Sequence, residues 1–225
     1  MNNKHLSQFN TLSEDEQAIV LALSVILMPM GQNVLVQLLK RSGCVDAKVA
    51  DKITPILKAK LNKTELVQIN HDGWRCREEV AEDLMKLAVK KEDFFNKLAD
   101  EVIKSSPPSY FIQSRFTLLN DLKFLRIYLY QGKVDEFVAT LHKIQASFPE
   151  HLNKIFNRLF FNNFNEQWFL SLDEQIQFSA LNYYLYANQD NLTDCSLQYQ
   201  LLEKYFSDSI NTGVQTALIA QRLQR

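Results

Sequence analysis

The chain has 225 residues, with 25 Lys and Arg against 26 Asp and Glu, so its formal net charge is −1. Hydrophobic residues make up 46% of the sequence and charged residues 23%, an ordinary balance for a globular protein, and Gly and Pro number only five each. These figures exclude a collagen-like chain, low-complexity disorder and a polycationic nucleic-acid tail. The scarcity of Gly also argues against a β-rich or α/β enzyme, which needs Gly at turns and phosphate loops.

Cysteine usage and hydropathy indicate the compartment. The three cysteines form no CxxC pair, which suits buried thiols in a reducing cytosol, and the start of the chain has no signal-peptide pattern. The first apolar run, residues 18–30, is about 13 residues long and contains Pro29, whereas a membrane span needs roughly 20. We therefore predict a cytoplasmic protein that does not contact a membrane.

Helical periodicity predicts two helices at the start of the chain. Ser13 and Glu16 have the spacing of a capping box, in which each side chain accepts a hydrogen bond from the other's backbone N–H. The helix that they begin should end near Pro29, because proline cannot continue a helix. A second helix is predicted over residues 34–41, and Gly43 stands at the position after a helix that favours left-handed backbone.

A third helix is predicted over about residues 46–62. Its apolar period continues across Pro55, so we favour one kinked helix over two helices, the second with Thr54 as its N-cap. The pattern then alternates as in strands, and an Asp-Gly pair at Gly73 predicts a small β-hairpin. Three helices followed by a hairpin is the order of a winged helix-turn-helix, which we assign to residues 1–104 as the first domain.

Basic side chains gather on the exposed face of the third helix and on the hairpin. A helical wheel and strand alternation place six of them on one side. They are Lys48, Lys52, Lys58, Lys63, Arg75 and Arg77. In a winged helix the third helix enters the major groove while the wing contacts the backbone, and lysines neutralise phosphates. Because the face lacks the Arg, Asn and Gln mixture that distinguishes bases, DNA binding is expected to be weakly sequence-selective.

A second interpretation explains these basic residues equally well. They can form a solvated lysine face on a winged helix that serves for protein contacts. Residues 1–104 carry equal numbers of basic and acidic side chains, so the domain as a whole is neutral. Both interpretations stay open at this point.

A Ser/Pro-rich segment at residues 105–109 predicts a domain boundary, because adjacent prolines cannot continue a helix. Beyond it, Phe, Tyr and Leu recur at helical spacing. The predicted helices cover about residues 110–131, 133–147, 150–163, 173–188, 192–207 and 211–225. Short turns between such helices predict antiparallel neighbours, so residues 110–225 form an array of α-hairpins. The abrupt end of the last helix fits either docking on its neighbours or a chain cut from a longer protein.

One stretch of the second domain resembles a tetratricopeptide repeat. Tyr128, Gly132 and Pro149 stand at that family's spacing, with Phe124 and Leu141 at its large apolar positions. Three positions where the family has small residues are occupied by Leu125, Phe137 and Ile144. We therefore predict a repeat-like hairpin array rather than a peptide-binding groove.

An aromatic cluster in the same domain is predicted to be core between stacked hairpins rather than an exposed ligand patch. Its members are Phe160, Phe161, Phe164, Trp168 and Phe169.

The sequence carries no motif for catalysis. Nucleotide-binding, dinucleotide-binding, hydrolase and zinc-protease signatures do not occur, and the four histidines are scattered. Neighbouring carboxylates such as Asp135 and Glu136 diverge on a helix, so they do not form an acid/base pair. His71 and Cys76 supply only two ligands, too few for zinc. We predict no enzymatic activity, no metal and no cofactor.

Three segments carry a wider resemblance: Leu-Val-Gln-Leu-Leu at residues 35–39, Gly-Trp-Arg-Cys-Arg at 73–77, and Leu-Arg-Ile-Tyr-Leu-Tyr-Gln-Gly at 125–132. In their order, with a winged helix before helical hairpins, the chain resembles the N-terminal accessory region of bacterial Snf2-type helicases. The resemblance implies a non-catalytic nucleic-acid-binding and regulatory module of a larger ATP-dependent protein, with the motor downstream. It also implies double-stranded nucleic acid as partner of the third helix and wing, and a protein partner for the helical array.

Two alternatives come from other functional classes. One is a protein-interaction adaptor whose winged helix packs on a partner. The other is a transcription regulator with a helical sensor domain, which would bind a palindromic site.

Overall fold

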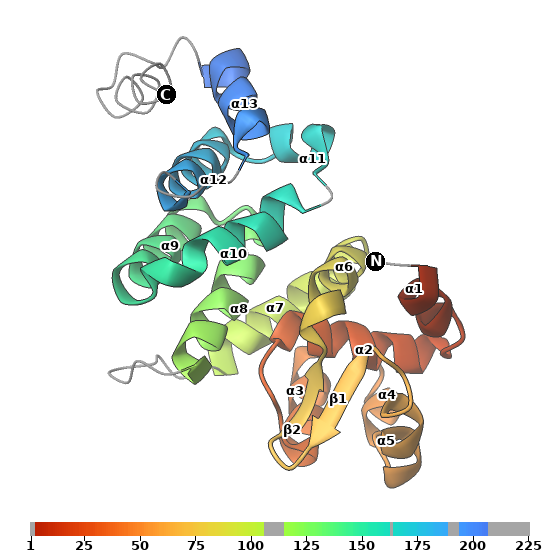
Figure 1. Cartoon of the computed structure of the whole chain (residues 1–225). Helices are drawn as coiled ribbons and strands as arrows, with labels where there is room; N and C mark the ends of the chain where they lie inside the picture. Colours follow the sequence, from red (N-terminus) through yellow and green to blue (C-terminus); the bar gives the residue numbers. More distant parts are fainter. Residues whose placement is uncertain (1–2, 106–114, 163, 189–193, 207–225) are drawn as a thin grey trace. The chain divides into compact units, whose positions relative to one another are not determined.

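The computed structural model of the protein is mostly helical, with one small antiparallel sheet (Figure 1). It describes residues 3–105, 115–162, 164–188 and 194–206. The chain divides into two compact units, Met1–Gln131 and Gly132–Arg225. The predicted mostly-α class is therefore confirmed.

The first unit is built around α2 (Glu14–Ile26), which follows the short helix α1 (Asn3–Asn10). The predicted capping box is present, because the Ser13 N–H donates to Glu16 Oε2 at 2.9 Å and the Glu16 N–H donates to Ser13 Oγ at 3.4 Å. All of the last eight residues of α2 are buried, so this helix is the centre of the core. It ends at Leu27, whose φ of 60° breaks the helix two residues before the predicted stop at Pro29.

The next helix agrees with the prediction, and the one after it does not. Helix α3 (Gln32–Ser42) ends at Gly43, which has the expected left-handed φ of 61°. The predicted single kinked helix is wrong: the structure has α4 (Ala47–Asp51) and α5 (Pro55–Leu61). Thr54 caps α5 by accepting the Leu57 N–H at 3.4 Å, and proline occupies the first helical position. The continuous apolar period did not reveal this break.

The predicted hairpin consists of β1 (Val67–Asn70) and β2 (Gly73–Cys76), which pair in antiparallel register. Trp74 and Cys76 point into the core, as expected from strand alternation. Met30, between α2 and α3, adds one more rung: its N–H and C=O bond the backbone of Trp74 at 2.9 and 2.8 Å.

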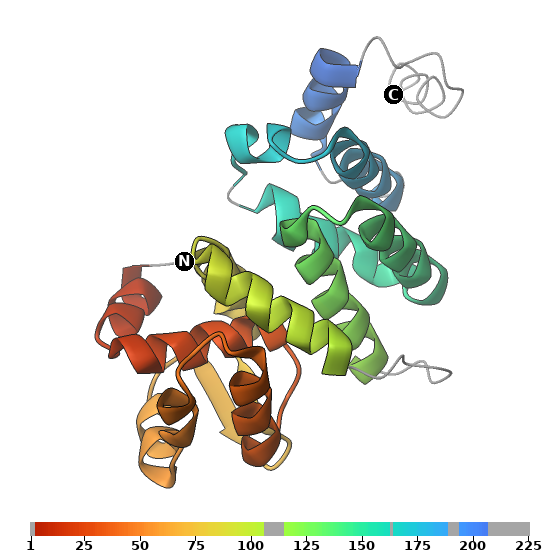
Figure 2. The ribbon, with the colours of Figure 1, turned by 180° about the vertical axis from the view of Figure 1, so that it is seen from behind.

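Three further helices complete the first unit: α6 (Glu78–Val89), α7 (Glu92–Ser105) and α8 (Arg115–Gln131). All three contact α2, and Figure 2 shows α7 on the back of the unit, alongside α3. The division between the units thus follows α8, at Gly132, whereas the sequence placed the boundary at residues 105–109 and α8 with the second domain. Residues 106–109 of that predicted boundary lie outside the described part of the chain.

The physical reason that α8 joins the first unit is a buried arginine. Arg126 is 2% exposed, and its guanidinium bonds Glu82 of α6 and two backbone carbonyls, those of Ser24 and Ala81, at 2.8 to 2.9 Å. The order of helices and turns along the sequence does not reveal this contact, so the sequence did not place α8 in the first unit.

The second unit consists of short helices around α12 (Glu174–Ala187), which contacts α9, α10, α11 and α13. The other elements are α9 (Val134–Ser147), η1 (Pro149–His151), α10 (Leu152–Phe156), the π-helical turn η2 (Asn157–Phe161), α11 (Glu166–Leu170) and α13 (Ser196–Phe206). Helix α11 was not predicted, and the helix predicted over residues 211–225 lies outside the described residues.

The aromatic cluster of this unit is mostly core, as predicted. Phe160, Phe161 and Phe169 are buried, while Phe164 and Trp168 are half-buried. No helix of the described ranges is long and apolar enough to cross a membrane.

Candidate nucleic-acid interface

The six basic residues singled out in the sequence lie on several elements of the first unit, at and around α4, α5 and the hairpin. They are Lys48 in α4, Lys52 at its C-cap, Lys58 in α5, Lys63 just after α5, Arg75 in β2, and Arg77 at the N-cap of α6. Five are exposed, and Arg75 is half-buried. The sequence grouped the four lysines on one face by treating residues 46–62 as a single helix. Because α4 and α5 are separate helices, that helical wheel does not describe the four lysines together.

On α5, the exposed surface is set by the two buried leucines, Leu57 and Leu61. At about 100° per residue, Lys58 and Lys60 lie on opposite sides of the helix relative to Leu57. The two lysines therefore face different surroundings although they are only two positions apart.

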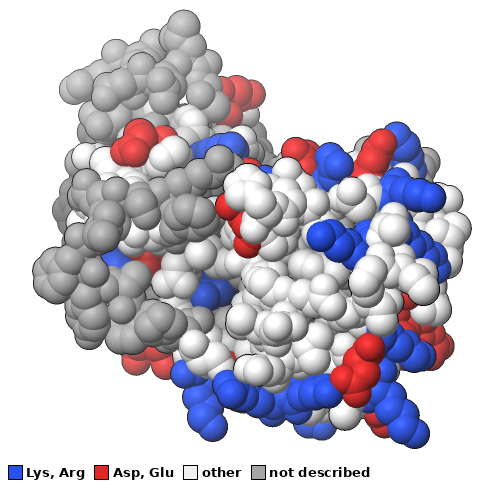
Figure 3. Space-filling view, turned by 90° about the horizontal axis from the view of Figure 1, so that it is seen from below, with Lys and Arg blue, Asp and Glu red and all other residues white. Residues whose placement is uncertain are grey.

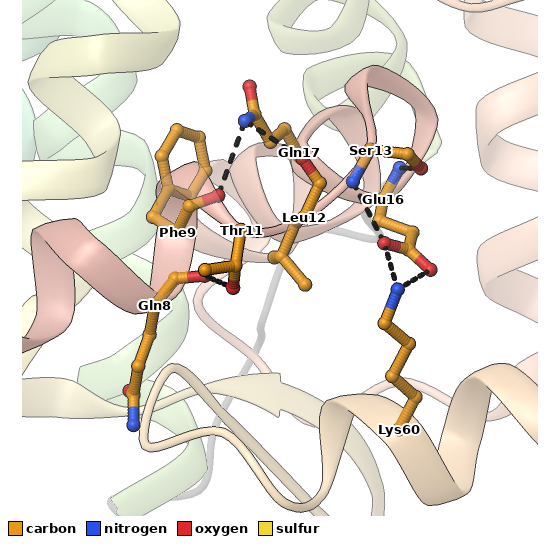
Figure 4. Close-up of polar contacts among 8 residues, drawn as sticks. All are labelled: Gln8, Phe9, Thr11, Leu12, Ser13, Glu16, Gln17 and Lys60. Carbon is orange, nitrogen blue, oxygen red and sulfur yellow. Dashed lines mark hydrogen bonds and ion pairs between the residues drawn. The ribbon is translucent and has the colours of Figure 1, made fainter.

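Three lysines of this region are held in ion pairs. Lys60 Nζ lies 2.6 and 2.7 Å from the two carboxylate oxygens of Glu16, as Figure 4 shows. Lys52 pairs with Asp15, the neighbour of Glu16 on the first turn of α2. Lys40 of α3 pairs with Asp51 of α4 at 2.5 Å. These pairs join the segments to one another, and they use one of the six predicted residues, Lys52.

Glu16 has a double role in this arrangement. Its carboxylate caps α2 through the Ser13 N–H and at the same time binds Lys60 from α5 (Figure 4). Partial burial raises the pKa of Glu16, but the hydrogen bonds from Lys60 and Ser13 and the charge of Lys60 outweigh it, and the pKa lies below its usual value of 4.5. Glu16 is thus a firmly ionised partner that fixes the position of Lys60.

The other lysines and arginines of this region have no acidic partner among the described residues. Lys48, Lys58, Lys63 and Arg77 form no ion pair with any residue that the structure describes. Arg41, which is not among the six predicted residues, is exposed in the last turn of α3 and likewise has no acidic partner in the described ranges. In the sequence, only its position directly after Lys40 indicates that Arg41 belongs to a basic region.

Arg75 is held on the surface of the hairpin by a neutral partner. Its Nε and Nη2 donate to Oε1 of Gln68, directly opposite on β1, at 2.9 and 2.5 Å. Because the amide is neutral, it fixes the direction of the guanidinium without compensating its charge.

Figure 3 views the protein from the side on which the hairpin, α3 and α5 lie in Figure 1. Lys and Arg side chains gather along one rim and one side of this surface, with fewer acidic groups between them. Within the described residues, no group of three or more His, Cys, Asp and Glu side chains is placed to hold a metal ion.

Comparisons with known proteins identify no relative. No family model matches the chain, and no curated protein or solved structure matches it significantly.

The charge balance of this surface suits a polyanion. Between residues 46 and 63 the only acidic residues are Asp46 and Asp51. Asp51 is neutralised by Lys40, and Asp46 accepts the Lys48 N–H at 2.8 Å as the N-cap of α4. The exposed lysines of this segment therefore outnumber the free acids, so that phosphate groups would meet a net positive surface.

Proposed function

We propose that the first unit is a winged helix-turn-helix module that binds double-stranded nucleic acid and has no catalytic activity of its own. The element order supports this proposal: α2, the single rung at Met30, α3, the pair α4–α5, then the hairpin. In this arrangement α5 is the helix that enters the major groove and the hairpin is the wing that contacts the backbone. Following the resemblance, the module serves a larger ATP-dependent, helicase-like protein in the cytoplasm.

The observation that carries the proposal is the contrast between paired and unpaired lysines. Lys52 and Lys60 are bound to acids of α2, whereas Lys48, Lys58 and Lys63 are exposed without an acidic partner in the described part of the chain. Exposed lysines without an acidic partner can neutralise phosphates of a duplex and release the counterions condensed there. Such contacts position the protein on the duplex without selecting sequence.

A second candidate function is supported by a different observation. Val34 on α3 and Ile56 on α5 are 57% and 83% exposed. Exposed aliphatic side chains on an interaction surface also suit a protein partner, and the repeat-like hairpins of the second unit offer a further surface for one. The alternative is therefore an adaptor that uses both units for protein contacts.

Binding to a labelled 20-base-pair duplex, followed by fluorescence anisotropy across a salt series, tests the proposal. The full chain is compared with the variant Lys48→Ala/Lys58→Ala/Lys63→Ala. We expect the wild type to give a steep log–log dependence on salt, and the variant to lose about 0.9 of slope for each phosphate contact removed.

A matched control is the variant Lys90→Ala/Lys91→Ala/Lys104→Ala. It changes the net charge equally, and Lys90 and Lys91 lie at the turn between α6 and α7, at the opposite end of the unit from the hairpin loop (Figure 1). Its slope should equal that of the wild type. Absence of binding at low salt would refute the proposal and favour the adaptor, and equal slopes for both triple variants would show that binding is merely a matter of total charge.

A further inference from the structure

Ile56 is the most exposed of the large hydrophobic side chains in the described residues, at 83%. It lies on the first turn of α5, the helix that the proposed function places in the major groove. Leu57, the next residue, is buried, so the exposure of Ile56 is a consequence of its position on the helix and not of a frayed segment. A single exposed aliphatic side chain is common on protein surfaces, so only the residues around Ile56 can indicate a ligand.

The neighbours of Ile56 form one exposed arc of α5. Ala59 and Asn62 follow it at intervals of three residues, which places the three side chains side by side, on the face opposite the buried leucines. All three are exposed. The amide of Asn62 has no hydrogen-bond partner among the described residues, so its donor and acceptor are both available.

Positive charge borders this arc. Lys58 lies beside it on α5, and Lys63 follows it directly in the chain, both exposed and without an acidic partner in the ranges described. Glu16, the acidic partner of α5, is bound by Lys60. An apolar surface bordered by free cations complements a polyanion that itself displays methyl groups, and duplex DNA has this combination in its major groove, where thymine carries a C5 methyl group.

We propose that α5 recognises A·T base pairs in duplex DNA, with Ile56 and Ala59 against thymine methyl groups and the amide of Asn62 on adenine. An amide side chain can bond adenine N6 and N7 together, and aliphatic side chains suit the thymine methyl. This selectivity rests on the proposed function and goes beyond the weak selectivity that the sequence alone predicted. It also commits the surface to DNA, because uracil has no C5 methyl and the major groove of A-form RNA does not admit a helix.

The test is the exchange of thymine for deoxyuridine, which removes the methyl group and leaves base pairing in place. Three labelled duplexes of equal length are titrated with the full chain at one salt concentration: an A·T duplex, the same duplex with deoxyuridine, and a G·C duplex. Burial of a methyl group is worth about fourfold in affinity. We therefore expect the A·T duplex to bind at least about fourfold more tightly than the deoxyuridine duplex.

The variant Ile56→Ala should reduce the difference between thymine and deoxyuridine, because Ala59 still contacts a methyl group, and should leave the salt slope unchanged. Since Ile56 is exposed, this substitution does not endanger folding. Val34→Ala, which truncates another exposed aliphatic residue on α3, is the control and should keep the difference. Asn62→Ala should reduce the preference for A·T over G·C without affecting the response to deoxyuridine.

The outcomes separate the two proposals. Binding of all three duplexes with equal affinity and a steep salt dependence would overturn the A·T inference and leave the nucleic-acid function intact. A thymine preference that is undiminished in Ile56→Ala, or reduced equally in Val34→Ala, would also overturn it. Absence of binding to every duplex at low salt would overturn both.

Discussion

Gly73 lies so close to the backbone of Met30 that position 73 has no space for a side chain. A Cβ atom there would stand 2.5 Å from the Met30 carbonyl oxygen and 2.9 Å from its nitrogen, and the φ of Gly73 is 125°. The close approach is a consequence of the two backbone hydrogen bonds between Met30 and Trp74. The hairpin is thus attached to the segment between α2 and α3 at a point where only glycine fits.

Replacement of Gly73 by alanine is therefore expected to destabilise the first unit by about 2 kcal/mol or more, from backbone strain together with the displaced Met30. Urea unfolding is followed by the fluorescence of Trp74, in a Trp168→Phe background so that one tryptophan reports. Gly31→Ala is the control, because nothing lies within 4 Å of its Cβ position and its φ is −61°. It should change stability by less than about 1 kcal/mol. Similar losses in both variants would contradict the steric explanation.

The buried pair of Arg126 and Glu82 gives a second prediction. Glu82 is 7% exposed and accepts from Arg126 at 2.9 Å and from the Tyr130 hydroxyl at 2.5 Å. Burial and the Glu82 charge raise the pKa of Tyr130 well above its usual value, so this hydroxyl remains a donor. Arg126→Met leaves the carboxylate buried without its cation, and we expect a loss of about 3–5 kcal/mol.

The double variant Arg126→Met/Glu82→Leu removes both charges and should recover part of that loss. Lys97→Ala, which breaks an exposed pair with Asp93 on α7, is the surface control and should cost less than about 1 kcal/mol. Measurement is by urea unfolding of the same fluorescence-reporting background. A double variant as unstable as Arg126→Met would show that the arginine contributes through packing and its hydrogen bonds to the Ser24 and Ala81 carbonyls instead of charge compensation.

How far the sequence predicted this fold depends on whether a feature is encoded locally. The capping box at Ser13, the C-terminal glycine of α3 and the Asp-Gly hairpin all depend on residues within four positions of each other, and all are present. The sequence did not predict the break between α4 and α5, because the buried residues Ile53 and Leu57 continue one apolar period across it. An apolar period shows which residues face the core. Two consecutive helices that pack on the same core can share one such period, so the period does not show where one helix ends and the next begins.

The candidate interface shows the same division. The apolar period predicts that Lys48, Lys58 and Lys63 are exposed, because it shows which neighbouring residues are buried, and all three are exposed. The pairing of Lys52 with Asp15, and of Lys60 with Glu16, joins residues far apart in sequence and depends on how α2 approaches α4 and α5. No periodicity carries that information, so the sequence could not distinguish a paired lysine from an available one.

The lowered pKa of Glu16 predicts how the first unit responds to acid. Because the folded pKa lies below the unfolded value, the folded state binds fewer protons near pH 4, and the stabilisation is complete above about pH 4.5. It is lost as the pH falls through the folded pKa. Glu16→Gln should therefore be less stable than wild type at pH 7, and the difference should shrink steadily as the pH falls from 5 to 3.

Urea unfolding at pH 3, 4, 5 and 7 measures this difference. Glu14→Gln changes the same charge on the same turn without removing a hydrogen bond, so it serves as the matched control. A gap between wild type and Glu16→Gln that stays constant over this range would contradict the ionic contribution of Glu16 and would leave only its capping geometry.

Lys58 and Lys60 differ by two positions on α5, and their substitutions should have opposite consequences. Lys60 is bound to Glu16, so Lys60→Met should lower the free energy of unfolding by about 0.5–1 kcal/mol and leave the salt slope of duplex binding nearly unchanged. Lys58 has no acidic partner in the described residues, so Lys58→Met should leave stability unchanged and lower that slope by about 0.9. Urea unfolding and the anisotropy salt series on the same two preparations decide the matter. If both substitutions reduced the slope equally, the ion pair with Glu16 would not keep Lys60 from phosphate, and the distinction between paired and available lysines on this surface would fail.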